Sequence, residues 1–328
     1  MTPIAVSVGN LTIYYSSIVI ALGVAACFLL TYSLYGSDGG RPAALAVYVP
    51  LAVVFSVLLS RVLHWYCHTE QYESFLQAVT NYRTGDFVLS GALIGTALSA
   101  LAVRGLRLTK SAGTLLDATA PGAVLAIACI RLSSLFNSSC LSKISIRNPD
   151  FQKLPFAYPF TDAAGNEEYR FATFFVEFLI LLVLFADVLR FWLNRRAVPA
   201  KRGSNRGSVA VMFLVRYCAI EMIADSTRFD SSFARSNGFV SMVQMFCAVC
   251  LLVALLFYSI RSVRSEGLRP AHWVFWLCFL AGLAVTGLSE YLVQRHGNWY
   301  LSCYAAMVWG CLFMAFSVSE LYRMHCEQ

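Results

Sequence analysis

Charged side chains are scarce in this 328-residue chain, because Asp, Glu, Lys and Arg together make up only 13% of it. A soluble domain carries about 25% of such residues. Hydrophobic residues reach 58%, and the mean hydropathy is strongly positive. This balance excludes an ordinary soluble domain and predicts an integral membrane protein.

Several other signals are missing as well. No charged segment with a small-residue cleavage site precedes the first apolar run, so we expect no removable signal peptide. The eleven cysteines are scattered singly, and no CxxC pair has a second pair or histidines nearby. Cys247 and Cys250 form a CxxC only inside an apolar run, where cysteine behaves as a small hydrophobe. We therefore expect no metal and no cofactor.

What the chain does contain is a series of apolar runs. A spanning helix needs about 20 mainly apolar residues. Nine runs qualify, and the third and sixth are short. They cover residues 11–34, 43–63, 87–103, 115–137, 171–193, 209–224, 241–260, 272–292 and 299–321. The sequence therefore predicts an all-α polytopic bundle of about nine transmembrane helices.

The basic residues predict how these helices are oriented. Alternate connections hold 14 of the 25 Lys and Arg residues, and such connections normally face the cytoplasm. They are residues 35–42, 104–114, 190–208, 261–271 and 322–328. We therefore expect the amino terminus outside and the carboxyl terminus inside. The net charge of +7 then reflects cytoplasmic loops, and we expect no nucleic-acid partner.

Two segments on the predicted outer side stand out. Aromatic and apolar residues recur every three or four positions in 64–83, which predicts an amphipathic helix on the membrane surface. Residues 138–170 are too long for a plain connection, and long loops are often functional.

Arg131 interrupts the fourth apolar run near its predicted outer end. An arginine inside a span is costly unless it faces a partner, a polar cavity or the interface. Its spacing from Ser134 and Ser138 places the three residues on one helical face. Either Arg131 extends to the outer headgroups, or it belongs to a polar pocket open to the outer leaflet.

Other spans place polar residues at a similar predicted depth. Glu177 lies two turns into the fifth span, and Glu221 and Asp225 share a face of the sixth, where Asp225 can pair with Arg228. Ser90 and Gly91 begin the third span. A structural salt bridge and a binding site both remain open, but Arg131 and Arg228 together would suit a phosphate.

Several stretches, taken in order, resemble the bacterial prolipoprotein diacylglyceryl transferases. They are IYYSSIVIALG (13–23), GDFVLSGALIG (85–95), LLDATAP (115–121), RLSSLFN (131–137), RFATFFVE (170–177), ADSTRFD (224–230) and SMVQ (241–244). Arg61 also occupies the place of a family arginine. The resemblance covers roughly residues 10–260. It divides the chain into a transferase-like membrane domain (1–260, seven helices) and two additional helices (261–328).

The chain departs from the family pattern at some positions. Ser90 replaces the family's histidine, Ser134 replaces the first asparagine of its arginine motif, and Glu221 aligns with an arginine. Asn137 and the acid at Asp225 are retained. Because serine cannot act as a base as histidine does, the change at Ser90 argues most strongly against full activity.

The resemblance implies a reaction at the outer leaflet of a bacterial plasma membrane. A diacylglyceryl group passes from phosphatidylglycerol to the lipobox cysteine of a prolipoprotein, so no cysteine of this chain is expected to be catalytic. It implies catalytic roles for Asp225, Glu221 and Ser90. The substrate-binding residues that it implies are Arg131, Asn137, Ser134, Arg228, Gly91, Arg61 and Glu177.

Two other functions compete with transfer. A non-catalytic relative could keep the lipid cavity and bind an anionic phospholipid or a lipoprotein, and the departures at Ser90, Ser134 and Glu221 favour it. A transporter would need a polar midplane site. Against it, the polar residues gather toward one end of the spans, and no inverted repeat is visible.

Overall fold

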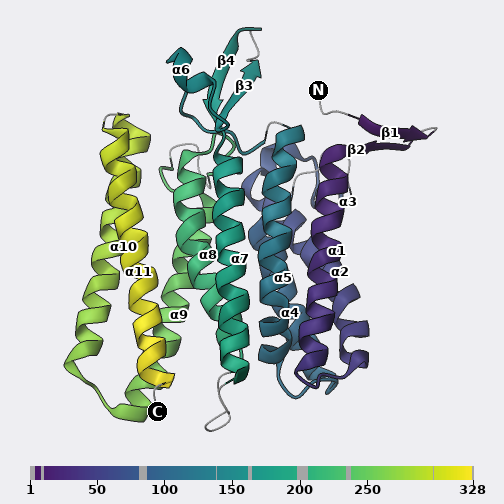
Figure 1. Ribbon diagram of the computed structural model, residues 1–328, viewed down its shortest axis with the longest axis vertical. Coiled ribbons are helices and arrows are strands. Elements are labelled where there is room, and N and C mark those ends of the chain that lie inside the picture. Colours follow the sequence, from purple (N-terminus) through teal and green to yellow (C-terminus); the bar gives the residue numbers. More distant parts are fainter. Residues whose placement is uncertain are drawn as a thin grey trace.

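The computed structural model describes residues 4–8, 11–80, 87–137, 139–161, 165–197, 206–233, 238–297 and 299–326. This part of the chain contains nine helices of at least 17 residues, which form an elongated bundle (Figure 1). They are α1 (Tyr15–Ser37), α2 (Pro42–Cys67), α4 (Leu89–Gly105), α5 (Ala112–Ser133), α7 (Thr173–Ala197), α8 (Ser208–Thr227), α9 (Met242–Glu266), α10 (Pro270–His296) and α11 (Tyr300–Cys326).

The fold is that of a helical membrane protein. Within the described residues, α1, α2, α5, α9, α10 and α11 are long and apolar enough to cross a membrane, and α4 is a shorter apolar helix. α7 and α8 are not among these six, and each carries charged residues along its length. The long helices lie where the sequence predicts them, but the count of nine spans and the orientation remain predictions.

Glycines at the helix contacts allow pairs of helices to pack closely. A side chain at Gly95 of α4 would meet the Phe55 backbone of α2 at 2.5 Å, and one at Gly23 of α1 would meet Cys129 of α5 at 2.5 Å. Gly282 and Gly310 bring α10 and α11 together in the same way. Small residues allow this approach where no hydrophobic force drives helices together in lipid.

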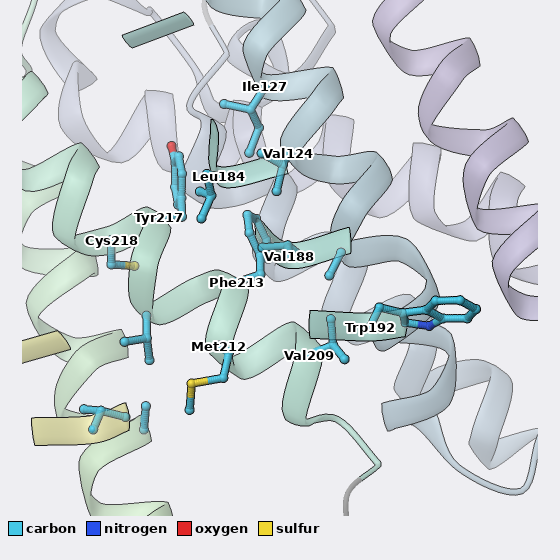
Figure 2. Close-up of a cluster of buried hydrophobic side chains, with 14 of the residues drawn as sticks. Val124, Ile127, Leu184, Val188, Trp192, Val209, Met212, Phe213, Tyr217 and Cys218 are labelled. Carbon is cyan, nitrogen blue, oxygen red and sulfur yellow. The ribbon is translucent and has the colours of Figure 1, made fainter. Parts of the chain in front are cut away.

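Helix α5 is the centre of the bundle. It packs against α1, α4, α7 and α8, and most of its length is buried. Between α5, α7 and α8 the side chains form a continuous apolar core (Figure 2). Its members include Val124, Ile127, Leu184, Val188, Trp192, Met212 and Phe213.

The prediction of one amphipathic helix over 64–83 is wrong. α2 continues to Cys67, a 3-10 turn η1 (Thr69–Gln71) follows, and a separate short helix α3 covers Phe75–Thr80. The backbone leaves the helical region at His68 and is extended at Tyr72, although the apolar spacing continues across both residues. Residues 81–83 lie outside the described residues.

Short elements cap one end of the bundle. β1 (Ile4–Val8) pairs with β2 (Leu11–Tyr14), so the first helix begins at Tyr15 instead of residue 11. Residues 138–170, expected as a loop, contain α6 (Pro149–Gln152), β3 (Ala157–Thr161) and β4 (Glu167–Phe171), which pairs with β3. The amino terminus and these strands lie at one end of the bundle, and the carboxyl terminus lies at the other (Figure 1).

The residues after η3 (Ser134–Phe136) hold the end of α8. The backbone N–H of Lys143 donates to the Thr227 carbonyl at 2.8 Å, and the N–H of Phe229 donates to the Leu141 carbonyl at 2.8 Å. Ser142 and Arg228 also form an isolated antiparallel bridge. The final turn of α8 is therefore fixed from outside its own helix.

At the opposite end, Asp117 of α5 caps the start of α8. Its carboxylate is fully buried and accepts hydrogen bonds from the N–H groups of Gly207 (2.7 Å) and Ala210 (2.9 Å). Arg195 of α7 donates to the same carboxylate. Since Gly207 has no side chain with which to cap the helix, Asp117 supplies the acceptor and the negative charge that a helix start favours.

We expect the change Asp117→Asn to destabilise the bundle by about 3 kcal/mol, because it removes the charge from a fully buried carboxylate that pairs with Arg195 and accepts two N–H groups at the start of α8. Unfolding by SDS in mixed micelles measures this loss. The matched control is Asp187→Asn, since Asp187 pairs with Arg216 on a half-exposed face and should contribute less than about 1 kcal/mol. Equal stability of the two variants would contradict the capping role.

Candidate functional site

Four charged side chains from three helices converge within the bundle. Arg131 lies in the last turn of α5, Glu177 and Glu221 lie on α7 and α8, and Arg228 caps the end of α8. Arg131 donates from Nε to Glu177 Oε1 at 2.9 Å and from Nη2 to Glu221 Oε1 at 2.7 Å. Arg228 donates to Glu221 Oε1 at 2.8 Å and also to Glu177 Oε1. We call these four residues the quartet.

The quartet is almost completely buried, because no member is more than 7% exposed. Its two positive and two negative formal charges cancel, which permits burial that a single ion would make prohibitive. Arg131 therefore does not extend out of the bundle, and its guanidinium pairs with two carboxylates.

The quartet nevertheless has unfilled hydrogen-bonding positions. All four arginine contacts converge on the Oε1 atoms of the two acids. Glu177 Oε2, Glu221 Oε2 and Arg228 Nε are buried and have no hydrogen-bond partner in the described part of the chain. Such groups are rare in proteins, and each is costly when it stays empty. These three atoms are places where a ligand or water can bind.

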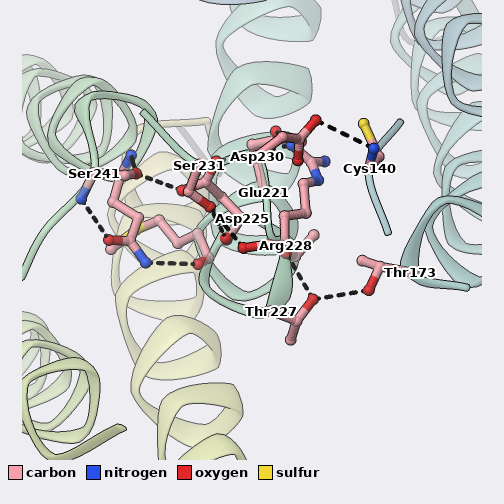
Figure 3. A network of polar contacts seen from close by, with 12 residues as sticks. Cys140, Thr173, Glu221, Asp225, Thr227, Arg228, Asp230, Ser231 and Ser241 are labelled. Carbon is pink, nitrogen blue, oxygen red and sulfur yellow. Dashed lines mark hydrogen bonds and ion pairs between the residues drawn. The ribbon is translucent and has the colours of Figure 1, made fainter. Parts of the chain in front are cut away.

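Asp225 lies beside the quartet (Figure 3). Its Oδ1 is 3.8 Å from Arg228 Nη1, so the predicted pairing across three residues is present, although the two glutamates lie closer to Arg228. The Ser241 hydroxyl, which begins α9, donates to the other oxygen of Asp225. Asp225 is 2% exposed and adds one negative charge to the neutral quartet.

Cys140 packs against Arg131 and was not selected by sequence reasoning. Arg131 Nη1 contacts the Cys140 sulfur at 3.5 Å, and the Cys140 backbone N–H donates to Asp230 Oδ2 at 3.2 Å. Burial raises the pKa of the Cys140 thiol, which outweighs the opposing effect of the nearby guanidinium groups of Arg228 and Arg131. The thiol is therefore protonated at neutral pH and is not an activated nucleophile.

Ser134 and Asn137 shape the turn after α5, and their side chains form hydrogen bonds within that turn. The Asn137 side-chain oxygen accepts from the N–H (3.1 Å) and the hydroxyl (2.6 Å) of Ser139. The Ser139 hydroxyl is also 2.9 Å from the Ser134 hydroxyl. Ser138, predicted on the same face as Arg131, lies outside the described residues.

Three other predicted site residues lie at the α2–α4 contact. Arg61 is 1% exposed, and its Nε and Nη2 donate to the Ala78 carbonyl of α3 at 2.9 and 2.7 Å. A side chain at Gly91 would lie 2.5 Å from Ser60 of α2. Ser90 is buried beside Gly91. Arg61 thus anchors the α3 segment, and Gly91 permits close packing of two helices.

A cavity of about 490 Å³ lies between α1, α2, α4, α5 and α8. Its walls are nearly all apolar, and the few hydroxyl groups are bonded within the protein, as in the 3.1 Å contact of Tyr48 with Thr119. None of the ten predicted site residues is among the described residues that line the cavity. Three lining residues are their sequence neighbours: Ile130 precedes Arg131, and Leu89 and Ala92 flank the pair Ser90 and Gly91.

The structure thus brings together Arg131, Glu177, Glu221, Asp225 and Arg228, and it places the remaining five elsewhere. Within the described residues, no group of three His, Cys, Asp or Glu side chains could hold a metal ion. The arrangement can bind an anion through two guanidinium groups or accept a proton at a buried carboxylate.

Fold and site together define a multi-pass helical membrane protein with a buried ionic cluster beside an apolar cavity. The family model described as prolipoprotein diacylglyceryl transferase matches residues 3–260 of the 328. The chain therefore belongs to this family of transferases of lipoprotein biosynthesis. A comparison with curated proteins finds no match. Helices α10 and α11 lie beyond the matched residues.

Charge balance in the quartet can be tested directly. Arg131→Met leaves two buried carboxylates with one arginine, and we expect it to lower the free energy of unfolding by about 3–5 kcal/mol. The double variant Arg131→Met/Glu177→Gln restores neutrality and should therefore be more stable than the single variant. Unfolding in SDS measures the stability of Arg131→Met, of Glu177→Gln and of the double variant. A double variant that loses the sum of its single losses would contradict this account.

Proposed function

We propose that this protein transfers a diacylglyceryl group from phosphatidylglycerol to the lipobox cysteine thiol of a prolipoprotein, at the outer leaflet of a bacterial plasma membrane. Family membership supports transfer of this general kind. The observation that carries the proposal is the buried quartet, with two arginines and three polar atoms that have no partner among the described residues.

Arg131 and Arg228 bind the phosphate in this proposal. Guanidinium groups match phosphate oxygens in a bidentate manner, and a dry site strengthens the attraction. Glu177 and Glu221 hold both arginines in place before the lipid arrives. The arginines then stabilise the charge that develops on the phosphate oxygen as the bond to the glycerol carbon breaks.

A carboxylate serves as the base. The thiol sulfur forms a bond to the glycerol carbon, the carbon–oxygen bond to phosphate breaks, and glycerol phosphate leaves with the electron pair. The thiol proton passes to Glu221 or Asp225, because a thiol of pKa about 8.5 needs only modest help. Glu221 has an oxygen without a partner in the described part of the chain, whereas Ser90 cannot serve as a base.

The apolar cavity accommodates the acyl chains. Its volume of about 490 Å³ is in the range of ligand sites, and its lining offers no unsatisfied polar group. Ile130 lines the cavity and directly precedes Arg131 in the sequence. We therefore place the lipid tails in the cavity and the phosphate at the quartet. The same apolar lining disfavours transport of a polar solute.

A non-catalytic lipid-binding protein is the second candidate. The observation in its favour is that both arginines already carry carboxylate partners, so the resting quartet is neutral. An anion must compete with these acids for the guanidinium groups. Binding without transfer would be the outcome if no base reaches the thiol.

The test is replacement of the native transferase in a depleted bacterium, with the mass of a reporter lipoprotein's cysteine as the readout. We expect a diacylglyceryl adduct with the wild-type chain and at least about a hundredfold less with Arg228→Gln, because the variant loses a charged contact in the transition state. Arg216→Gln is the control, since Arg216 lies on the same helix but pairs with Asp187. No adduct from a well-inserted wild-type chain would favour the non-catalytic candidate.

A further inference from the structure

The α10–α11 hairpin, which lies beyond the residues matched by the family, contributes a buried acid to the bundle. Its described residues contain two acids, Glu290 and Glu320. Glu320 pairs with Arg323 of its own helix at 2.9 Å. Glu290 is only 3% exposed and points toward α8. An acid inside a membrane helix is costly, so its partners indicate what it does.

Both oxygens of Glu290 accept hydrogen bonds. The Ser226 hydroxyl of α8 donates to Oε2 at 2.5 Å, and Gln294 Nε2 donates to Oε1 at 2.8 Å. Lys143 Nζ in turn donates to Gln294 Oε1 at 3.3 Å. Hydrogen bonds to a charged group are about twice as strong as neutral ones. Glu290 therefore forms a charged attachment of the hairpin to the last turn of α8, where the Tyr304 side chain of α11 also bonds Ser226.

That turn carries the residues of the proposed site. Ser226 lies between Asp225 and Thr227, and Arg228 follows directly. The Thr227 carbonyl accepts from the Lys143 N–H at 2.8 Å, so the hairpin and the segment after η3 hold the same turn. Loss of hydration lowers the pKa of the Lys143 ammonium, and the carboxylates of Glu290, Asp225 and Asp230 oppose this effect.

We infer that Glu290 is a positioning residue for phosphatidylglycerol: through Ser226 it holds the last turn of α8 so that Arg228 meets the phosphate. This inference rests on the proposed function. It makes the additional hairpin part of the working site and not only a brace for the bundle. Glu290 itself acts through Ser226 and does not contact the lipid.

The change Glu290→Gln, made in the full chain, should raise the KM for phosphatidylglycerol about tenfold, the effect of one charge-assisted hydrogen bond. A smaller folded fraction would lower the apparent kcat but would not move KM, so KM separates positioning from mere stability. Ser226→Ala should raise KM similarly, and the double variant should not exceed the larger single effect. Glu320→Gln is the control and should leave KM unchanged.

The binding of phosphatidylglycerol to the same purified variants separates this inference from the proposed function. A wild-type chain that binds the lipid without transfer, with binding weakened by Glu290→Gln or by Ser226→Ala, would refute catalysis and support the positioning role. Unchanged KM and unchanged lipid binding in folded Ser226→Ala would overturn the inference. A wild-type chain that neither binds nor transfers would overturn both.

Discussion

Four charges buried in an apolar bundle must neutralise one another, and this requirement constrains the rest of the structure. Each guanidinium of the quartet bridges both glutamates, so α5, α7 and α8 have to meet in one register. A shift of any helix by one turn would separate opposite charges, and a buried unpaired ion costs several kcal/mol. The apolar core between these helices supplies the close packing that keeps the register fixed.

Helix α5 links the ionic cluster to the cavity. Arg131 points toward α7 and α8, while the neighbouring Ile130 lines the cavity. Asp117, near the start of the same helix, holds the beginning of α8, and Arg131, near its end, pairs with Glu221 of α8. Helix α5 thus adjoins both a polar site that suits a headgroup and an apolar cavity that suits the tails. This division suits a phospholipid substrate better than a polar solute.

Hydropathy located the nine long helices of the described residues, because each contains an apolar run, although six of them are long and apolar enough to cross a membrane. It also marked Arg131, Glu177 and Glu221, since a charge inside such a run needs a partner, and Asp225 and Arg228 follow the end of the sixth run. Most of the ion pairs could not be predicted from the sequence. Helical spacing predicts only the local Asp225–Arg228 contact, whereas the Arg131–Glu177 pair depends on how α5 and α7 pack. Arg61 shows the reverse, because its partner is a backbone carbonyl that no side-chain pattern reveals. Glu290 obeys the same rule as Glu177, but it lies beyond the part of the chain that resembles the family.

The account depends most on the claim that the quartet binds the lipid phosphate, and lipid binding tests it most directly. The measurement compares phosphatidylglycerol retained by the purified wild-type chain with that retained by Arg131→Met/Glu177→Gln, whose remaining pair is neutral. Zwitterionic phosphatidylethanolamine serves as the reference lipid. The account predicts selective retention by the wild type and its loss in the folded double variant. Equal retention of phosphatidylglycerol by both proteins would contradict it.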